Sequence, residues 1–161
     1  MRTIKAKPLS VEAFHPYGSY LNVVNPSGNH LGDFYNDHVS FPCGGTLPVA
    51  FSSLVIHKSE QLVITAVEYH NTTCEAILAM DDDVVLHVAP PTNVPAPQLT
   101  EAFIVPAGTL VKLNTGVWHM GAYPLNKETA HLLIVLPERI YANDCTVVEY
   151  ALEDQMQIEV I

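Results

Sequence analysis

The sequence predicts an all-β fold, either a sandwich or a barrel, with a short helix near its N-terminal end. Beyond residue 48, short runs rich in β-branched and aromatic residues alternate with turn signals, among them Asp-Asp-Asp at 81–83 and Asn-Thr-Gly at 114–116. The 161 residues fit one domain, residues 1–161, and a hydrophobic fraction of 48% indicates a compact globule.

The helix is expected within residues 8–21. Ser10 is a suitable N-cap, and Glu12 falls in the first turn, where the helix dipole favours a negative charge. Pro16 and Gly18 should end the helix after about two turns.

Residues 22–48 are rich in Asn, Gly and Pro, and they are expected to form loops around one short strand near residues 34–41. The strands expected after these loops cover residues 48–57, 62–69, 76–79, 84–88, 101–105, 111–113 and 131–136. Two more strands are expected at residues 147–152 and 153–161, the second at a sheet edge.

Composition excludes several kinds of protein. A net charge of −10 with only seven Lys and Arg disfavours nucleic acid as a partner, and would repel an anionic substrate unless a metal or a buried cation offset it. No apolar run reaches the roughly 18 residues of a membrane span. Residues 1–7 lack the apolar segment of a signal peptide, so a cytoplasmic location is expected. Cys43, Cys74 and Cys145 share no metal-ligand spacing and are expected to be reduced thiols.

Three ionisable side chains lie close together in the chain: Glu68, His70 and Glu75. Residues two apart in a strand point to the same face, so Glu68 and His70 should face the same way. A turn over residues 71–74 should return the chain and bring Glu75 close to His70 on the neighbouring strand.

A second segment, residues 105–119, is apolar, contains two glycines and ends in His119. Burying an imidazole without a partner would cost roughly 2 kcal/mol or more, so we expect His119 to meet His70 and Glu75 inside the barrel. Imidazoles and carboxylates that converge in this way suit a divalent metal with a preference for nitrogen and oxygen ligands. Without a metal, the same groups suit general acid–base catalysis.

These two segments resemble the two sequence motifs of the cupin superfamily, a double-stranded β-helix or jelly-roll barrel. The first motif is matched by His70-x4-Glu75, and the second by Pro106-x-Gly108 with Gly116-x-x-His119. Cupins usually show His-x-His before the Glu, whereas Glu68 stands at the first His position here. The resemblance implies one divalent metal ion (Zn, Mn, Ni or Fe) and no organic cofactor, and the implied metal ligands are His70, Glu75 and His119.

More narrowly, the chain is similar to the ureidoglycolate lyase family over nearly its full length. Residues 8–18 resemble the family's N-terminal helix, residues 68–70 its Glu-Arg-His segment, and residues 114–119 its Val-Trp-His-His-Pro-Leu segment. Tyr69 replaces the usual Arg, and Glu75 replaces a Gln. The second change restores the usual cupin metal ligand.

The residues expected to be catalytic are His70, Glu75, His119 and Lys112. Those expected to contact the substrate are Glu68, Trp118 and His131. Lys112 has two possible roles, because it faces opposite to its strand neighbours Val111 and Leu113. It would bind a substrate carboxylate if the pocket lay on its side of the sheet, and would otherwise point to solvent.

The resemblance implies an enzyme of the lyase type that releases urea from ureidoglycolate and leaves glyoxylate. Glu75 or His70 would be the base, and His119 the acid. Two alternatives remain: a non-catalytic cupin that binds a small polar ligand or sugar, and a metal-dependent cupin enzyme such as a sugar isomerase. A small-molecule substrate and a homodimer are the expected partners, with no nucleic acid and no membrane.

Overall fold

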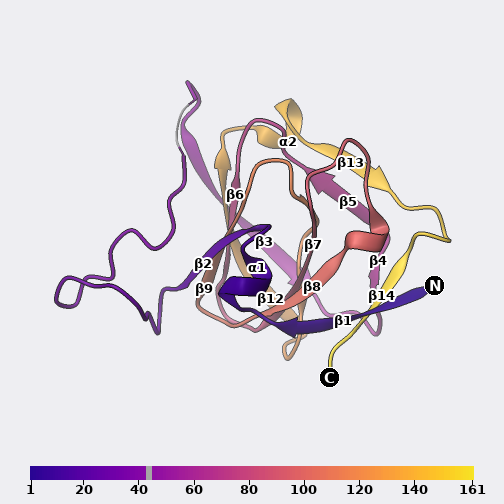
Figure 1. The fold of residues 1–161 in the computed structure, drawn as a ribbon, viewed down its shortest axis with the longest axis horizontal. Helices are drawn as coiled ribbons and strands as arrows, with labels where there is room; N and C mark the ends of the chain where they lie inside the picture. Colours follow the sequence, from indigo (N-terminus) through magenta and orange to yellow (C-terminus); the bar gives the residue numbers. More distant parts are fainter. Residues whose placement is uncertain (43–44) are drawn as a thin grey trace.

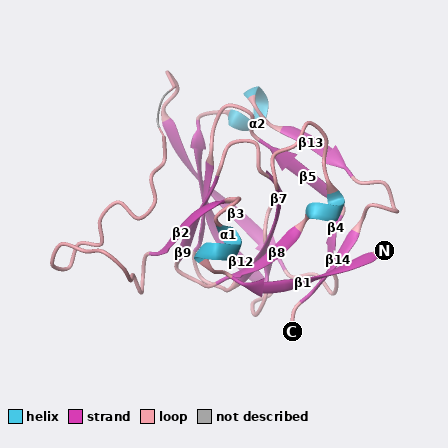
Figure 2. Ribbon diagram, viewed as in Figure 1, coloured by secondary structure: helices cyan, strands magenta, loops and turns pink. Residues whose placement is uncertain are grey.

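The computed structural model describes residues 1–42 and 45–161, and it confirms the predicted all-β, double-stranded β-helix fold (Figure 1). Two curled β-sheets face each other, and helices are few and short (Figure 2). The five-stranded sheet has the order β2 (Gly18–Asn22), β9 (Thr109–Leu113), β6 (Glu75–Ala79), β12 (Thr129–Pro137) and β3 (Val49–His57).

The second sheet has nine strands and curls back on itself. Its order is β13 (Thr146–Glu149), β5 (Ala66–Tyr69), β10 (Trp118–His119), β7 (Val84–Ala89), β8 (Glu101–Val105), β1 (Arg2–Pro8), β14 (Met156–Glu159) and β4 (Leu62–Ile64), with β11 (Tyr123–Pro124) beside β7. Only Thr65 separates β4 from β5, although they lie near opposite ends of this order, so the sheet curls until its ends meet.

The curl produces two hydrophobic cores that share strand β7. The inter-sheet core lies between the sheets and includes Phe14, Leu86 and Phe103. The curl core lies inside the nine-stranded sheet and includes Val85 and Trp118. Alternate residues of β7 therefore enter different cores, and every residue of this strand is buried. That explains why β7 is an almost continuous apolar run in the sequence.

Helix α1 (Val11–Phe14) is shorter than expected, a single turn where about two were predicted. The predicted cap is confirmed, because Ser10 Oγ accepts a hydrogen bond from the Ala13 amide at 3.2 Å. The chain enters strand β2 at Gly18, whose close pairing with β9 leaves no room for a side chain: a Cβ there would lie 1.8 Å from the Lys112 carbonyl oxygen. This pairing ends the helix early.

Most strand predictions are confirmed, with three corrections. The expected strand at residues 34–41 is wrong, because this segment runs away from the barrel and finds no neighbouring strand to pair with (Figure 1). The expected strand at 62–69 is interrupted at Thr65. The last strand, β14, is not at an edge, since it lies between β1 and β4. The prediction for Cys43 falls outside the described residues.

Six elements were not anticipated: strands β1, β2, β10 and β11, the 3₁₀ helix η1 (Pro97–Leu99) and helix α2 (Ile140–Asn143). Strand β1 pairs in parallel with β14 on one side and β8 on the other, so its structure depends on partners distant in sequence. In the part of the chain that the structure describes, no helix is long and apolar enough to span a bilayer.

We expect Phe14→Ala to lower the free energy of unfolding by about 3–5 kcal/mol, because it would leave a cavity in the inter-sheet core. Phe14 is 0% exposed, and its ring meets Phe103 edge to face at 5.3 Å. Val11, 65% exposed in the same helical turn, supplies the control, and Val11→Ala should change stability by only about 0.5 kcal/mol. Urea unfolding curves measure both, and equal losses would refute the assigned packing.

Candidate active site

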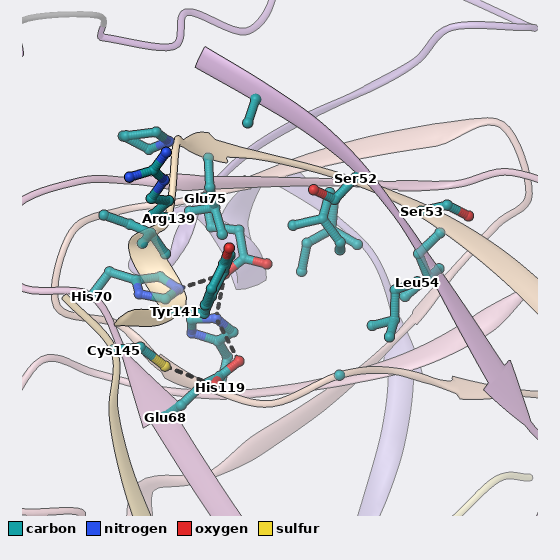
Figure 3. A pocket seen from close by; sticks show the side chains of 18 residues that line it. Ser52, Ser53, Leu54, Glu68, His70, Glu75, His119, Arg139, Tyr141 and Cys145 are labelled. Atoms are coloured by element: carbon teal, nitrogen blue, oxygen red, sulfur yellow. Dashed lines mark hydrogen bonds and ion pairs between the residues drawn. The ribbon is translucent and has the colours of Figure 1, made fainter. Parts of the chain in front are cut away.

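A cavity of about 280 Å³ opens between the two sheets at one end of the barrel (Figure 3). One wall comes from β3 and β12, with Ser52 and Leu54 on the first of these strands. The opposite wall carries the ionisable residues, and helix α2 contributes at the rim. Most of the remaining lining is apolar, so charges buried within the cavity are poorly screened.

The ionisable group, here called the His–Glu cluster, consists of Glu68, His70, Glu75 and His119. Glu75 Oε2 lies 3.0 Å from His70 Nε2 and 2.7 Å from His119 Nε2. These three side chains are buried, whereas Glu68 is partly exposed and its Oε1 lies 4.0 Å from His119 Nε2. The predicted meeting of His70, Glu75 and His119 within one cavity is therefore observed.

Local pairing explains how the cluster forms. Glu68 and His119 are directly opposite each other on β5 and β10, which places both side chains on the cavity face. The two motifs are also joined through the backbone, because the Gly116 amide donates to the His70 carbonyl at 2.8 Å. Gly116 has a φ of +82°, a conformation that favours glycine and allows the turn before His119.

The turn after β5 is held by a residue from a distant segment. The carboxylate of Asp144 accepts hydrogen bonds from the amides of Asn71 and Thr72, at 2.8 and 2.7 Å. The backbone carbonyl of Asp144 accepts a hydrogen bond from His70 Nδ1 at 2.7 Å. One residue therefore fixes both the turn and the orientation of the His70 ring.

Both imidazoles carry a hydrogen on Nδ1, because each Nδ1 faces a carbonyl that can only accept. His119 Nδ1 donates to the Val117 carbonyl at 2.9 Å, as His70 Nδ1 does to Asp144. Each Nε2 then faces the carboxylate of Glu75. In a metal-free site each Nε2 must carry a proton to make these contacts favourable, and otherwise a cation is needed between the three groups.

The pKa values of the cluster follow from this contact. Burial alone would raise the pKa of Glu75, but the charges and hydrogen bonds of His119 and His70 hold it at about 2. Burial alone would lower the pKa of each histidine, and the contact with Glu75 outweighs it, so both pKa values are raised. The carboxylate and the two imidazoles thus stabilise one another's charged forms.

The donor atoms also fit a divalent metal. One potential ligand atom from each of the four cluster residues lies within 4.8 Å of the others. Two imidazole Nε2 atoms and carboxylate oxygens form the nitrogen and oxygen set expected for such an ion. The Nδ1 hydrogen bonds to backbone carbonyls are the outer contacts that orient metal-binding histidines.

Three residues expected at the site lie elsewhere. Trp118 packs in the curl core and its indole nitrogen donates to Thr92 Oγ1 at 3.1 Å, because neighbours in a strand face opposite ways. Lys112 lies on the outer face of β9, since its two neighbours fill the inner face. His131, at the far end of β12, contacts Asp81 through Nδ1 at 2.9 Å. None of the three lines the cavity within the described chain.

The segment from Arg139 to Cys145 reaches the cavity without having been anticipated. Arg139, Tyr141 and Cys145 all line it. The Cys145 thiol donates to Glu68 Oε2 at 3.1 Å, and burial together with this carboxylate raises the pKa of Cys145 to about 12. The thiol is therefore a hydrogen-bond donor and not a thiolate. The one signal the sequence offered was the adjacent pair Asp144-Cys145 just before a strand.

A β-barrel cavity in which two imidazoles share a buried carboxylate defines an enzyme site for acid–base or metal-assisted chemistry on a small substrate. The sequence model of the ureidoglycolate lyase family matches residues 1–159. The chain belongs to the ureidoglycolate lyase family, and its members are lyases.

Individual relatives agree with this assignment. The chain is 27% identical to a ureidoglycolate lyase of Pseudomonas paraeruginosa over 143 residues, which cover 83% of each chain. It is 25% identical to a ureidoglycolate lyase of Chelativorans sp. over 140 residues, covering 83% of this chain and 85% of the relative.

Solved structures with some likeness were also found. One is oxalate decarboxylase from Bacillus subtilis, studied for its Mn(II) centres, with a TM-score of 0.44 and 13% identity over 63% of this chain and 23% of that longer chain. Another is a dTDP-6-deoxy-D-glucose-3,5-epimerase from Legionella pneumophila, with a TM-score of 0.37 and 18% identity over 72% of this chain and 57% of the other.

The His–Glu cluster should make stability depend on pH in a defined way in chelator-treated protein. The pKa of Glu75, about 2, lies below its ordinary 4.5, so its contribution is present above pH 4.5 and lost as pH falls towards 2. The pKa values of His70 and His119 are raised above their ordinary 6.5. The stability that these two protonated histidines contribute is therefore fully present below pH 6.5 and is lost as pH rises through their pKa values in the folded protein.

Wild type should therefore exceed Glu75→Gln in stability most strongly between about pH 4.5 and 6.5, with the difference shrinking on either side. Urea unfolding at a series of pH values measures this difference. Glu75→Gln keeps the side-chain shape and removes the charge, so a difference that does not vary with pH would contradict the assigned coupling.

Proposed function

We propose that this protein cleaves ureidoglycolate into urea and glyoxylate, and that the His–Glu cluster carries out the proton transfers. The observation that supports this most directly is the contact of Glu75 Oε2 with both imidazole Nε2 atoms inside a small cavity. The family and the names of its relatives point to the same substrate. A cavity of about 280 Å³ is large enough for a molecule of this size.

The reaction needs one base and one acid. The base removes the proton of the carbinol hydroxyl, the oxygen forms the aldehyde carbonyl, and the carbon–nitrogen bond breaks. The acid gives a proton to the urea nitrogen as it leaves. His70 acts as the base through Nε2 after it has lost the proton that it shares with Glu75 in the resting site, and His119, still protonated against Glu75, acts as the acid. Both rings are held by their Nδ1 hydrogen bonds, so their Nε2 atoms stay directed at the cavity.

Glu75 supports both steps. Its negative charge stabilises whichever imidazole is protonated, and burial strengthens this interaction. Because its Oε2 contacts both Nε2 atoms, Glu75 also provides a path by which the proton taken up by His70 returns to His119 after each turnover. The acid and base are thereby restored without a net gain or loss of protons.

Our proposal includes a divalent metal ion in the same site. His70, Glu75 and His119 would hold it, with Glu68 as a nearby fourth group. Bound there, the ion would polarise the carbinol hydroxyl and offset the negative charge of the carboxylates. We further propose that the protein is cytoplasmic and that it is a homodimer, in line with the pairing of small cupins through their sheets.

His119→Ala should lower kcat for urea release by about a hundredfold to ten-thousandfold, since the leaving nitrogen would lose its acid. Urea formed from ureidoglycolate can be measured directly. His57→Ala provides a matched control, because His57 is exposed at the end of β3 and does not line the cavity. Unchanged turnover in His119→Ala would reject the assigned role. Wild type without turnover would leave a ligand-binding or isomerase function.

Metal content separates the two forms of the proposal. If a metal resides in the cluster, purified wild type should carry about one equivalent of Zn, Mn, Ni or Fe, and His70→Ala and Glu75→Ala should each reduce metal affinity by about tenfold or more. Elemental analysis after equilibration with each metal makes the measurement. His57→Ala should bind like wild type. Wild type that remains metal-free yet turns over substrate would establish acid–base catalysis by the side chains alone.

A further inference from the structure

The cavity presents an electrostatic problem for an anionic substrate. Glu68 and Glu75 both line it, and the chain as a whole has a net charge of −10. A carboxylate entering such a site needs a cation close to its binding position. The chain has seven Lys and Arg residues, and the structure describes all of them: Arg2, Lys5, Lys7, Lys58, Lys112, Lys127 and Arg139. Arg139 is the only one of the seven that lines the cavity.

The other cations are occupied or distant from the cavity. Lys7 contacts Glu101 at 2.6 Å, and Lys127 contacts Asp81 at 3.5 Å. Arg139 has an ion partner too, Glu138, whose Oε1 lies 3.3 Å from Nε. The Arg139 and Glu138 side chains are 70% and 42% exposed, and exposed pairs of this kind are weak. The guanidinium can therefore exchange this neighbour for an incoming carboxylate, to which it can form two parallel hydrogen bonds.

The backbone around Arg139 supports a role at the site. Arg139 has a φ of +61°, in the left-handed region that favours glycine, and it precedes helix α2 without making a side-chain cap. A residue with a long side chain is held there against its backbone preference, a condition that often marks functional positions. In Figure 3, Arg139 and Tyr141 lie on the same side of the cavity as His70, across from Ser52 and Leu54.

The same segment is anchored to the His–Glu cluster at its other end. Asp144 bonds His70, and the Cys145 thiol bonds Glu68. Ile140, next to Arg139, is buried and fixes the start of α2. The position of Arg139 relative to the cluster is thus set by a short, well-attached piece of chain.

We propose that Arg139 binds the carboxylate of the substrate and so turns its carbinol carbon towards His70, Glu75 and His119. This inference rests on the proposed function, and it names the residue that would determine the preference for a carboxylate. The guanidinium lies at the rim and the acid–base groups lie inside. A substrate with a carboxylate at one end and a leaving nitrogen at the other would then bind in a single orientation.

Calorimetric titration with two small probes tests this assignment. Glycolate carries the carboxylate, and glycolamide is its uncharged counterpart. Arg139→Gln should weaken glycolate binding by about tenfold or more and leave glycolamide binding unchanged, whereas Arg139→Lys should lie between wild type and Gln. Arg139→Gly suits the left-handed backbone and should lose glycolate binding as Gln does, which separates the side chain from any folding defect.

Lys58→Gln is the matched control, since it removes one positive charge at an exposed position away from the cavity. It should bind both probes like wild type. The proposal is overturned if Arg139→Gln binds glycolate as wild type does, if Lys58→Gln weakens glycolate equally, or if wild type binds glycolate no more tightly than glycolamide.

Kinetics with ureidoglycolate distinguish this inference from the proposed function. Arg139→Gln should raise KM by about tenfold or more with a much smaller change in kcat, because the residue positions the substrate and transfers no proton. Urea release with an unchanged KM in Arg139→Gln would remove the role of Arg139 and keep the lyase function. If glycolate binding depends on Arg139 but the protein releases no urea, the role of Arg139 is kept and the lyase function is rejected.

Discussion

The contact of one buried carboxylate with two imidazoles is the interaction on which the site depends. Glu75 comes from the five-stranded sheet. His119 lies in the nine-stranded sheet and His70 directly follows its strand β5, so this contact joins the two layers at one end of the barrel. Without the histidines, a buried Glu75 would be costly to ionise. Without Glu75, burial would favour neutral imidazoles, and the acid–base pair would lose its charge.

The rest of the fold keeps these three groups in place. Strand pairing places Glu68 directly opposite His119. The hydrogen bond from the Gly116 amide to the His70 carbonyl connects the second motif to the first. The segment before β13 completes the arrangement, because Asp144 fixes the His70 ring from outside the cavity. Apolar residues from β3 and β12 form the far wall, which limits solvent around the charged groups and strengthens their mutual attraction.

Local pattern predicted the fold class, most strands and the meeting of His70, Glu75 and His119, because strand alternation and short spacings are properties of neighbouring residues. Local pattern failed where the structure of a segment depends on contacts with residues distant in the sequence. Strand β1 depends on two parallel partners, and Arg139 reaches the cavity through a helix with no periodic signal. The expectation that Trp118 contacts the substrate was wrong for a local reason. Adjacent residues of a strand face opposite ways, so Trp118 in β10 had to face away from His119.

The solitary arginine at the cavity rim of an acidic protein has a consequence for the ionic conditions under which the protein works. At low ionic strength the net charge of −10 repels any small anion over a distance of about 10 Å or more. Added salt screens that long-range repulsion before it weakens a direct contact with a guanidinium. Encounter with an anion should therefore become faster as salt rises from low concentrations, which is the opposite of the behaviour of enzymes that attract their substrates electrostatically.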